Sequence, residues 1–144
     1  MSDTAGAEPE RSENPAKLPL PLQTGADSHT TLLQLRTVVA TFVHERNWEQ
    51  FHNPKNLAMS LAIETAELME HFQWRTLEES ANVVHQPGER QKIAEELSDC
   101  LAYILALANV MQLDLSQALV AKMEKNAQKY PIDQAAGRWE RPTH

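Results

Sequence analysis

The sequence predicts an all-α protein, and three observations support that prediction. From His29 onward, apolar residues recur at intervals of three and four, as they do along one face of a helix. Residues typical of helix starts precede several of these stretches. Nowhere does the chain alternate apolar and polar residues as a half-buried strand would. With 144 residues and one cysteine, the chain suits a single domain without an internal disulfide.

Four long helices and one short helix are expected. The apolar periodicity places the long helices at about 30–46, 54–72, 89–111 and 114–130, and the short helix at about 77–83. N-cap signals support three of the starts: Asn53 before Pro54, Thr76 with Glu79, and Asp114 with Gln117. Gln86-Pro87-Gly88 should break the chain, and Pro131 should end the last helix.

The helical region has a tail on each side. Residues 1–28 hold half of the eight prolines and half of the four glycines, without any periodicity, so we expect a disordered or loosely attached tail. Residues 29–131 form the predicted helical domain, and residues 132–144 an irregular C-terminal tail. The net charge of −7 argues against nucleic acid or an anionic membrane as a partner. No apolar run is long enough to span a membrane and no signal-peptide pattern is present, so a cytoplasmic protein is expected.

The helix at 89–111 is apolar nearly all round in its second half. A four-helix chain this short can hardly bury such a helix alone, so a homo-oligomer is predicted. The alternative is a central helix within a monomer. The apolar residues concerned are Leu97, Leu101, Ile104, Leu105, Leu107, Ala108 and Val110.

Two acidic pairs interrupt otherwise apolar helices. Glu64 and Glu67 are three residues apart, as are Glu96 and Asp99, so each pair occupies one helical face. If the two helices are antiparallel neighbours, the four carboxylates converge. Two like charges ~4 Å apart repel by roughly 4 kcal/mol at an effective dielectric constant of ~20, so a divalent cation such as Mg²⁺ would have to lie between them. The alternative is two solvated acidic edges.

Other polar and aromatic residues fit a phosphate compound but also fit simpler roles. The chain has no glycine-rich phosphate loop, so metals and cations would have to bind phosphate. One helical face carries Lys122, Asn126 and Lys129. The alternative is an ordinary solvated face, on which cations near a helix C-terminus interact favourably with the helix dipole. Trp48, His52 and Trp74 bracket the helix at 54–72, where aromatic rings either stack on a base or pack against helix ends.

With these residues in hand, the chain resembles the MazG-like all-α nucleoside triphosphate pyrophosphohydrolases, and within them the dCTP pyrophosphatase branch. The resemblance covers about residues 29–131. It is carried by ERNWEQFHNPKNL (45–57), IETAELMEHFQW (63–74), EELSD (95–99) and KMEKNAQKYP (122–131).

The resemblance implies a four-helix bundle protomer assembled as a homotetramer, a dimer of dimers. It implies hydrolysis of a nucleoside triphosphate, here dCTP or a modified dCTP, to the monophosphate and pyrophosphate, with Mg²⁺ or alternatively Mn²⁺. By position, the metal ligands and catalytic residues would be Glu64, Glu67, Glu96 and Asp99. The phosphate- and sugar-binding residues would be Lys122, Asn126, Lys129 and Tyr130. The base-binding residues would be Trp48, His52, Trp74 and Tyr103.

Two positions depart from the family pattern. Ile63 stands where the broad family often has a further glutamate, which leaves the number of metal ions open. Val39 stands where vertebrate dCTP enzymes have a base-pocket histidine, which leaves the preferred base open. Glu64 is the first candidate for the proton acceptor because apolar residues flank it. The alternatives are a related hydrolase acting on dUTP or another nucleotide, and a non-catalytic helical oligomerisation or binding module.

Overall fold

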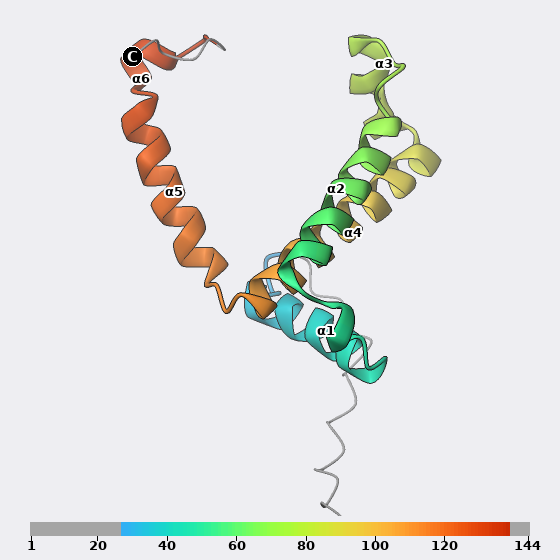
Figure 1. The fold of residues 1–144 in the computed structure, drawn as a ribbon. Helices are drawn as coiled ribbons and strands as arrows, with labels where there is room; N and C mark the ends of the chain where they lie inside the picture. The colour runs from blue at the N-terminus through green and yellow to red at the C-terminus, as the bar shows by residue number, and fades with distance from the viewer. Residues whose placement is uncertain (1–26, 139–144) are drawn as a thin grey trace, which may run out of the picture.

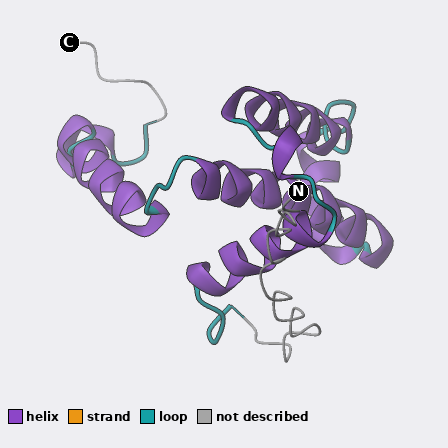
Figure 2. Ribbon diagram, turned by 60° about the horizontal axis from the view of Figure 1, so that its bottom comes forward, coloured by secondary structure: helices purple, strands orange, loops and turns teal. Residues whose placement is uncertain are grey.

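The computed structural model describes residues 27–138, and every regular element among them is helical (Figure 1; Figure 2). The predicted all-α class is therefore confirmed. The predicted tail over 1–28 lies almost wholly outside the described residues. The long helices are α1 (Leu32–Glu45), α2 (Pro54–Glu70), α4 (Pro87–Val110) and α5 (Leu115–Lys129), and the short ones are η1 (Glu49–Phe51), α3 (Leu77–Asn82), η2 (Val83–His85) and α6 (Ile132–Ala135).

The helix starts follow the N-cap signals of the sequence. The Asn53 side chain accepts a hydrogen bond from the Asn56 backbone N–H at 3.0 Å, with Pro54 in the first turn. Thr76 and Glu79 form the predicted capping box, and the Asp114 side chain accepts from the backbone N–H of Gln117. These starts were predictable because an N-cap is a contact within three residues.

Two boundaries differ from the prediction. Pro87 begins α4 instead of breaking the chain, because a proline in the first helical turn has no intrahelical N–H to lose. The segment after Pro131 was expected to be irregular, but Ile132–Ala135 forms one further helical turn.

The α2–α4 pair is the packed centre of the chain. The two helices run side by side, and α1 packs against the C-terminal half of α4 (Figure 1). Leu57 of α2 and Leu105 of α4 are each only 2% exposed. At the other end, Arg75 donates to Glu89 Oε2 at 2.8 Å, which ties the residues after α2 to the start of α4. Burying one such leucine contributes roughly 1.5–3 kcal/mol.

Helix α5 stands apart from this centre. It leaves α4 at an angle of 104°, and none of the main helix–helix contacts among residues 27–138 involves it (Figure 1). Leu119 and Val120 of α5 are 62% and 60% exposed, while Leu97 and Leu101 of α4 are 53% and 41% exposed. Within the described part of the chain, apolar surface is therefore open on both arms.

Among the described residues, no single helix is long and apolar enough to cross a membrane. Helices α4 and α5 would meet the length and composition criteria only together, and they are sharply bent relative to each other.

Candidate active site

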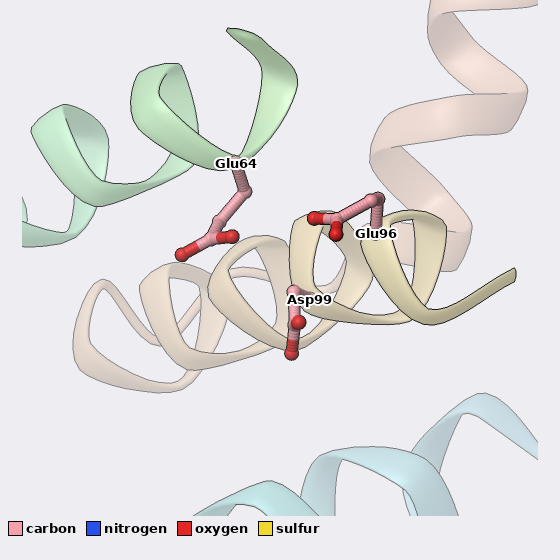
Figure 3. Close-up of side chains that lie close together, drawn as sticks. All are labelled: Glu64, Glu96 and Asp99. Carbon is pink, nitrogen blue, oxygen red and sulfur yellow. The ribbon is translucent and has the colours of Figure 1, made fainter. Parts of the chain in front are cut away.

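Three of the four predicted carboxylates meet between α2 and α4. Glu64 on α2 and the pair Glu96 and Asp99 on α4 each place one carboxylate oxygen within 4.8 Å of the others (Figure 3). Glu64 lies two helical turns after Leu57, whose burial turns this face of α2 toward α4. Asp99 lies two turns before the buried Ala106 on the facing helix. Packing of the two helices thus brings the carboxylates together, and we call Glu64, Glu96 and Asp99 the carboxylate cluster.

The electrostatics of the carboxylate cluster disfavour negative charge. Partial burial raises the pKa of Glu64, and the nearby charges of Glu67, Asp99 and Glu96 raise it further. None of the ion pairs formed within residues 27–138 involves a member of the cluster. Two charges ~5 Å apart repel by roughly 3 kcal/mol at an effective dielectric constant of ~20, and by less where water screens the exposed Asp99. A cation would relieve this repulsion.

The cluster fits a divalent cation that prefers oxygen ligands. An octahedral ion with metal–oxygen distances of about 2.1 Å needs ligand oxygens roughly 3–4 Å apart, and it retains water at its remaining positions. The oxygens of the cluster, within 4.8 Å of one another, lie close to that spacing. All three side chains of the cluster are carboxylates, the donor type that Mg²⁺ and Mn²⁺ take from proteins.

Glu67, the fourth predicted ligand, lies one turn beyond Glu64 and is exposed. It does not belong to the group whose oxygens lie within 4.8 Å of one another. Its charge nevertheless raises the pKa of Glu64, so it borders the site. Its role as a metal ligand stays a prediction.

A pocket of about 410 Å³ adjoins the carboxylate cluster and contains three of the four predicted base-binding residues. Its lining includes Trp48, His52 and Tyr103, together with Phe51, Ser60 and Ile63. Ile63 directly precedes Glu64, and Tyr103 follows Asp99 by one turn. An aromatic pocket beside converging carboxylates is suited to a flat ring joined to a phosphate chain.

The end of α1 positions Trp48 at this pocket. Asn47 adopts a left-handed conformation with φ of 53°, and the Trp48 N–H donates to the Val43 carbonyl at 3.0 Å. This reversed turn closes α1 as a Schellman motif and directs the chain back across the helix end. The Trp48 ring then packs edge-on against Phe42, with ring centroids 5.8 Å apart.

The remaining predicted residues lie away from the carboxylate cluster within one chain. Trp74 is 88% exposed beyond the end of α2 and lines neither this pocket nor the one described below. Lys122, Asn126 and Lys129 lie on α5, which departs from the α2–α4 pair, and Tyr130 follows directly (Figure 1). The Lys129 ammonium lies 5.5 Å from the centre of the Tyr130 ring. The acidic and basic halves of the predicted site are therefore separate in the protomer.

Two polar residues of the pocket were missed in the sequence. Asn56 and Ser60 line it, and both lie at four-residue spacing on the face of α2 that ends at Glu64. That spacing was a readable signal, because residues at i, i+4 and i+8 share one face of a helix.

A second hollow, of about 370 Å³, was also missed. Its lining includes Val39, His44, Glu49 and His52, and His44 Nδ1 lies 2.6 Å from Glu49 Oε1. A backbone N–H and the His44 ring, both bonded to Glu49, lower the pKa of that carboxyl group. The contact crosses a helix end, so helical periodicity gives no sign of it.

Comparisons with known proteins agree with this geometry. A model described as the MazG-like family matches residues 59–141. Bovine (Bos taurus) dCTP pyrophosphatase 1 is 44% identical over 110 residues, covering 76% of this chain and 65% of that protein. The human (Homo sapiens) protein of the same name is 46% identical over 101 residues, covering 70% of this chain and 59% of that protein. The chain therefore spans less than two thirds of the length of these relatives.

A solved structure is similar over nearly its whole length. It is a pyrophosphatase from Archaeoglobus fulgidus, with a TM-score of 0.66 and 39% sequence identity. The alignment covers 72% of this chain and 94% of that one.

Proposed function

The chain belongs to the MazG-like family, and from that premise we propose that it is a metal-dependent nucleoside triphosphate pyrophosphohydrolase. The proposed substrate is dCTP or a modified dCTP, the class named for the bovine and human relatives. The reaction consumes water and yields the monophosphate and pyrophosphate. The single observation that carries the proposal is the carboxylate cluster, with oxygens within 4.8 Å of one another, beside an aromatic pocket.

In this proposal each part of the site binds one part of the substrate. Trp48, His52 and Tyr103 enclose the nucleoside, and aromatic faces suit a base because every base has a π-face. Glu64, Glu96 and Asp99 hold Mg²⁺, or alternatively Mn²⁺, where the triphosphate begins. Glu67, one turn beyond Glu64 and near enough to raise its pKa, is the proposed fourth ligand.

The chain's own contribution to the chemistry is mainly positioning and charge. When bound, the cation would neutralise triphosphate charge and make attack by water easier. Water adds to the α-phosphorus, the bond from that phosphorus to the bridging oxygen breaks, and pyrophosphate leaves. Glu64, which apolar neighbours partly shield from water, is the first candidate to accept the proton that water loses.

We propose further that a second copy of the chain completes the site. Lys122, Asn126, Lys129 and Tyr130 would bind the outer phosphates and the sugar from α5 of a neighbouring subunit, in a homotetramer built as a dimer of dimers. The exposed leucines of α4 and α5 support this, because apolar surface on both arms needs a cover. Trp74, 88% exposed, would cover the nucleoside pocket of a neighbour in the same way. Cytoplasmic location and the absence of nucleic-acid and membrane partners stay predictions.

The test is a substrate panel with the purified full chain and Mg²⁺. We expect pyrophosphate, and no orthophosphate, from dCTP, at a higher rate than from dUTP, dATP or dGTP. Higher turnover of dUTP than of dCTP would support the proposed reaction but contradict the proposed preference for cytosine. Release of orthophosphate, or no turnover of any triphosphate, would contradict the proposal.

A second readout separates the enzyme from a non-catalytic helical module. Mg²⁺ should bind the native state alone, so it should raise the melting temperature. At a hundredfold excess over Kd, the added free energy of unfolding is about 2.7 kcal/mol. The Glu64→Gln variant should lose this response. A melting temperature insensitive to Mg²⁺ would favour the non-catalytic module.

A further inference from the structure

Arg36 on α1 binds the junction between α4 and α5. Its Nε donates to Asn109 Oδ1 at 2.8 Å, and its Nη1 donates to the Leu113 carbonyl at 2.9 Å. Its Nη2 lies 3.4 Å from the Ala108 carbonyl, and Asn109 Nδ2 donates back to the Arg36 carbonyl at 3.0 Å. One half-buried guanidinium group therefore contacts the last turn of α4 and the connector that follows it.

The connector itself leaves little freedom. Gln112 is left-handed with φ of 54°, and the Leu113 N–H donates to the Ala108 carbonyl at 3.0 Å, which closes α4 as a Schellman motif. Asp114 then caps α5 at once, by accepting from the backbone N–H of Gln117 at 2.9 Å. The left-handed conformation is unfavourable for glutamine, so contacts around it must hold it in place.

These contacts set the direction of α5. The four residues between α4 and α5 are the only covalent link to a helix without substantial packing of its own among residues 27–138. A small rotation at Gln112 would move the far end of α5, about 20 Å away at 1.5 Å per residue, by several ångströms. Arg36 binds Asn109, which precedes Gln112, and the Leu113 carbonyl, which follows it, and so restricts that rotation.

We propose that Arg36 is a positioning residue that fixes the angle between α4 and α5, and thereby the placement of the α5 cations at the site of a neighbouring subunit. The proposal rests on the proposed function for its effect on catalysis, but not for its effect on the angle. A planar guanidinium group is required, because one lysine ammonium cannot reach both the Asn109 side chain and the Leu113 carbonyl in this fork geometry.

A matched control lies at the other end of α4. Arg75 also uses its guanidinium group to join segments, donating from Nε to the His71 carbonyl at 2.7 Å and from Nη2 to Glu89 at 2.8 Å. It has no contact with the α5 junction. Arg75→Met should therefore lower stability without changing the angle of α5, whereas Arg36→Met should change both.

The direct test measures the α4–α5 angle in solution. Spin labels at Glu70→Cys on α2 and Lys125→Cys on α5, both exposed, report the distance between the two arms in a Cys100→Ser background. Labelled chains are diluted with unlabelled protein so that only distances within one chain count. We expect one narrow distribution for the parent and for Arg75→Met, and a broad or shifted one for Arg36→Met. An unchanged distribution in Arg36→Met would overturn the proposal.

Kinetics supply the second test. Misplaced α5 cations should raise KM for the triphosphate by roughly tenfold or more, with Arg36→Lys recovering only part of the loss. The response of the melting temperature to Mg²⁺ should stay intact, since the carboxylate cluster lies on α2 and α4. If Arg36→Met does not fold, Asn109→Ala removes half of the contact and is tested identically. A KM equal to that of the parent would also overturn the proposal, and a parent without turnover would instead defeat the proposed function.

Discussion

The α2–α4 pair and α5 are opposites within one short chain. The pair is held by buried leucines and by the Arg75–Glu89 contact, and it assembles the carboxylate cluster. Helix α5 has no buried residue, and it carries Lys122 and Lys129 without substantial packing against another helix in the described part of the chain. An isolated helix of 15 residues is marginal in water, and among residues 27–138 α5 has no substantial packing against another helix.

If the proposed site is correct, its acidic and basic halves depend on different levels of assembly. Folding of one chain brings the negative groups together at an electrostatic cost, which a divalent cation would offset. The positive groups lie on an arm that extends away, and association would have to bring them in.

The largest effect is expected from Glu64→Gln. This change keeps the size of the side chain but removes a metal ligand and the first candidate for the proton acceptor, so turnover should fall roughly 10²–10⁴-fold. Pyrophosphate release under saturating dCTP measures it. Glu95→Gln is the matched control, because Glu95 is exposed on α4 and bonds only to Gln91. Full turnover in Glu64→Gln would contradict the assigned site.

A smaller effect is expected from the cations of α5. Lys122→Met with Lys129→Met should raise KM for dCTP by about tenfold or more, because two charge-assisted contacts to the outer phosphates are lost. Glu124→Gln changes the charge of α5 on the opposite side of the helix, two residues after Lys122, and should leave KM within twofold, about 0.4 kcal/mol. A comparable KM change in Glu124→Gln would indicate a general charge effect instead of a site.

Stability provides a third contrast between the regions. Leu57→Ala should cost about 2–5 kcal/mol, since this side chain is 2% exposed in the single chain. Leu119 is 62% exposed in the single chain. In a monomer, Leu119→Ala should therefore lower the free energy of unfolding by less than about 0.5 kcal/mol. If α5 packs on a second subunit, Leu119→Ala should instead lower the melting temperature in a concentration-dependent manner. Thermal unfolding over a hundredfold range of protein concentration decides between them.

The smallest effect is expected from the pH dependence of stability at Glu89, in the first turn of α4. Hydrogen bonding and charge from Lys92, with further charge from Arg75 and His71, lower the pKa of Glu89. A carboxyl group with a depressed folded pKa stabilises the protein above its unfolded pKa, and this contribution is lost as pH falls through the folded value. Acid unfolding of Glu89→Gln should therefore differ from the parent near neutrality and converge with it at low pH. A constant difference across pH would contradict this role for Glu89.

Features set within a few residues could be predicted from the sequence, and features set between helices could not. The N-caps at Asn53, Thr76 and Asp114 are local contacts, and they are where the sequence placed them. The pairing of Glu64 with Glu96 and Asp99 was predictable only on the condition that their helices are neighbours.

The direction of α5 had no sequence signal. It depends on a left-handed Gln112, where glycine is the usual residue, and on hydrogen bonds from Arg36, more than 70 positions away in the chain. The four-residue spacing of Asn56 and Ser60 indicated that they share a helix face with Glu64. Asparagine and serine are common on helix surfaces, so their residue types did not indicate a pocket.

Subunit complementation shows whether two chains share one active site. Glu64→Gln chains lack the acidic half of the site and Lys122→Met, Lys129→Met chains lack the basic half, so each alone should turn over dCTP poorly at a fixed low concentration. If one chain supplies the carboxylates and another supplies the lysines, unfolding and refolding the two variants together should restore turnover well above the sum of the separate variants. Turnover that never exceeds that sum, in mixtures shown to contain both chains in one assembly, would contradict the shared site.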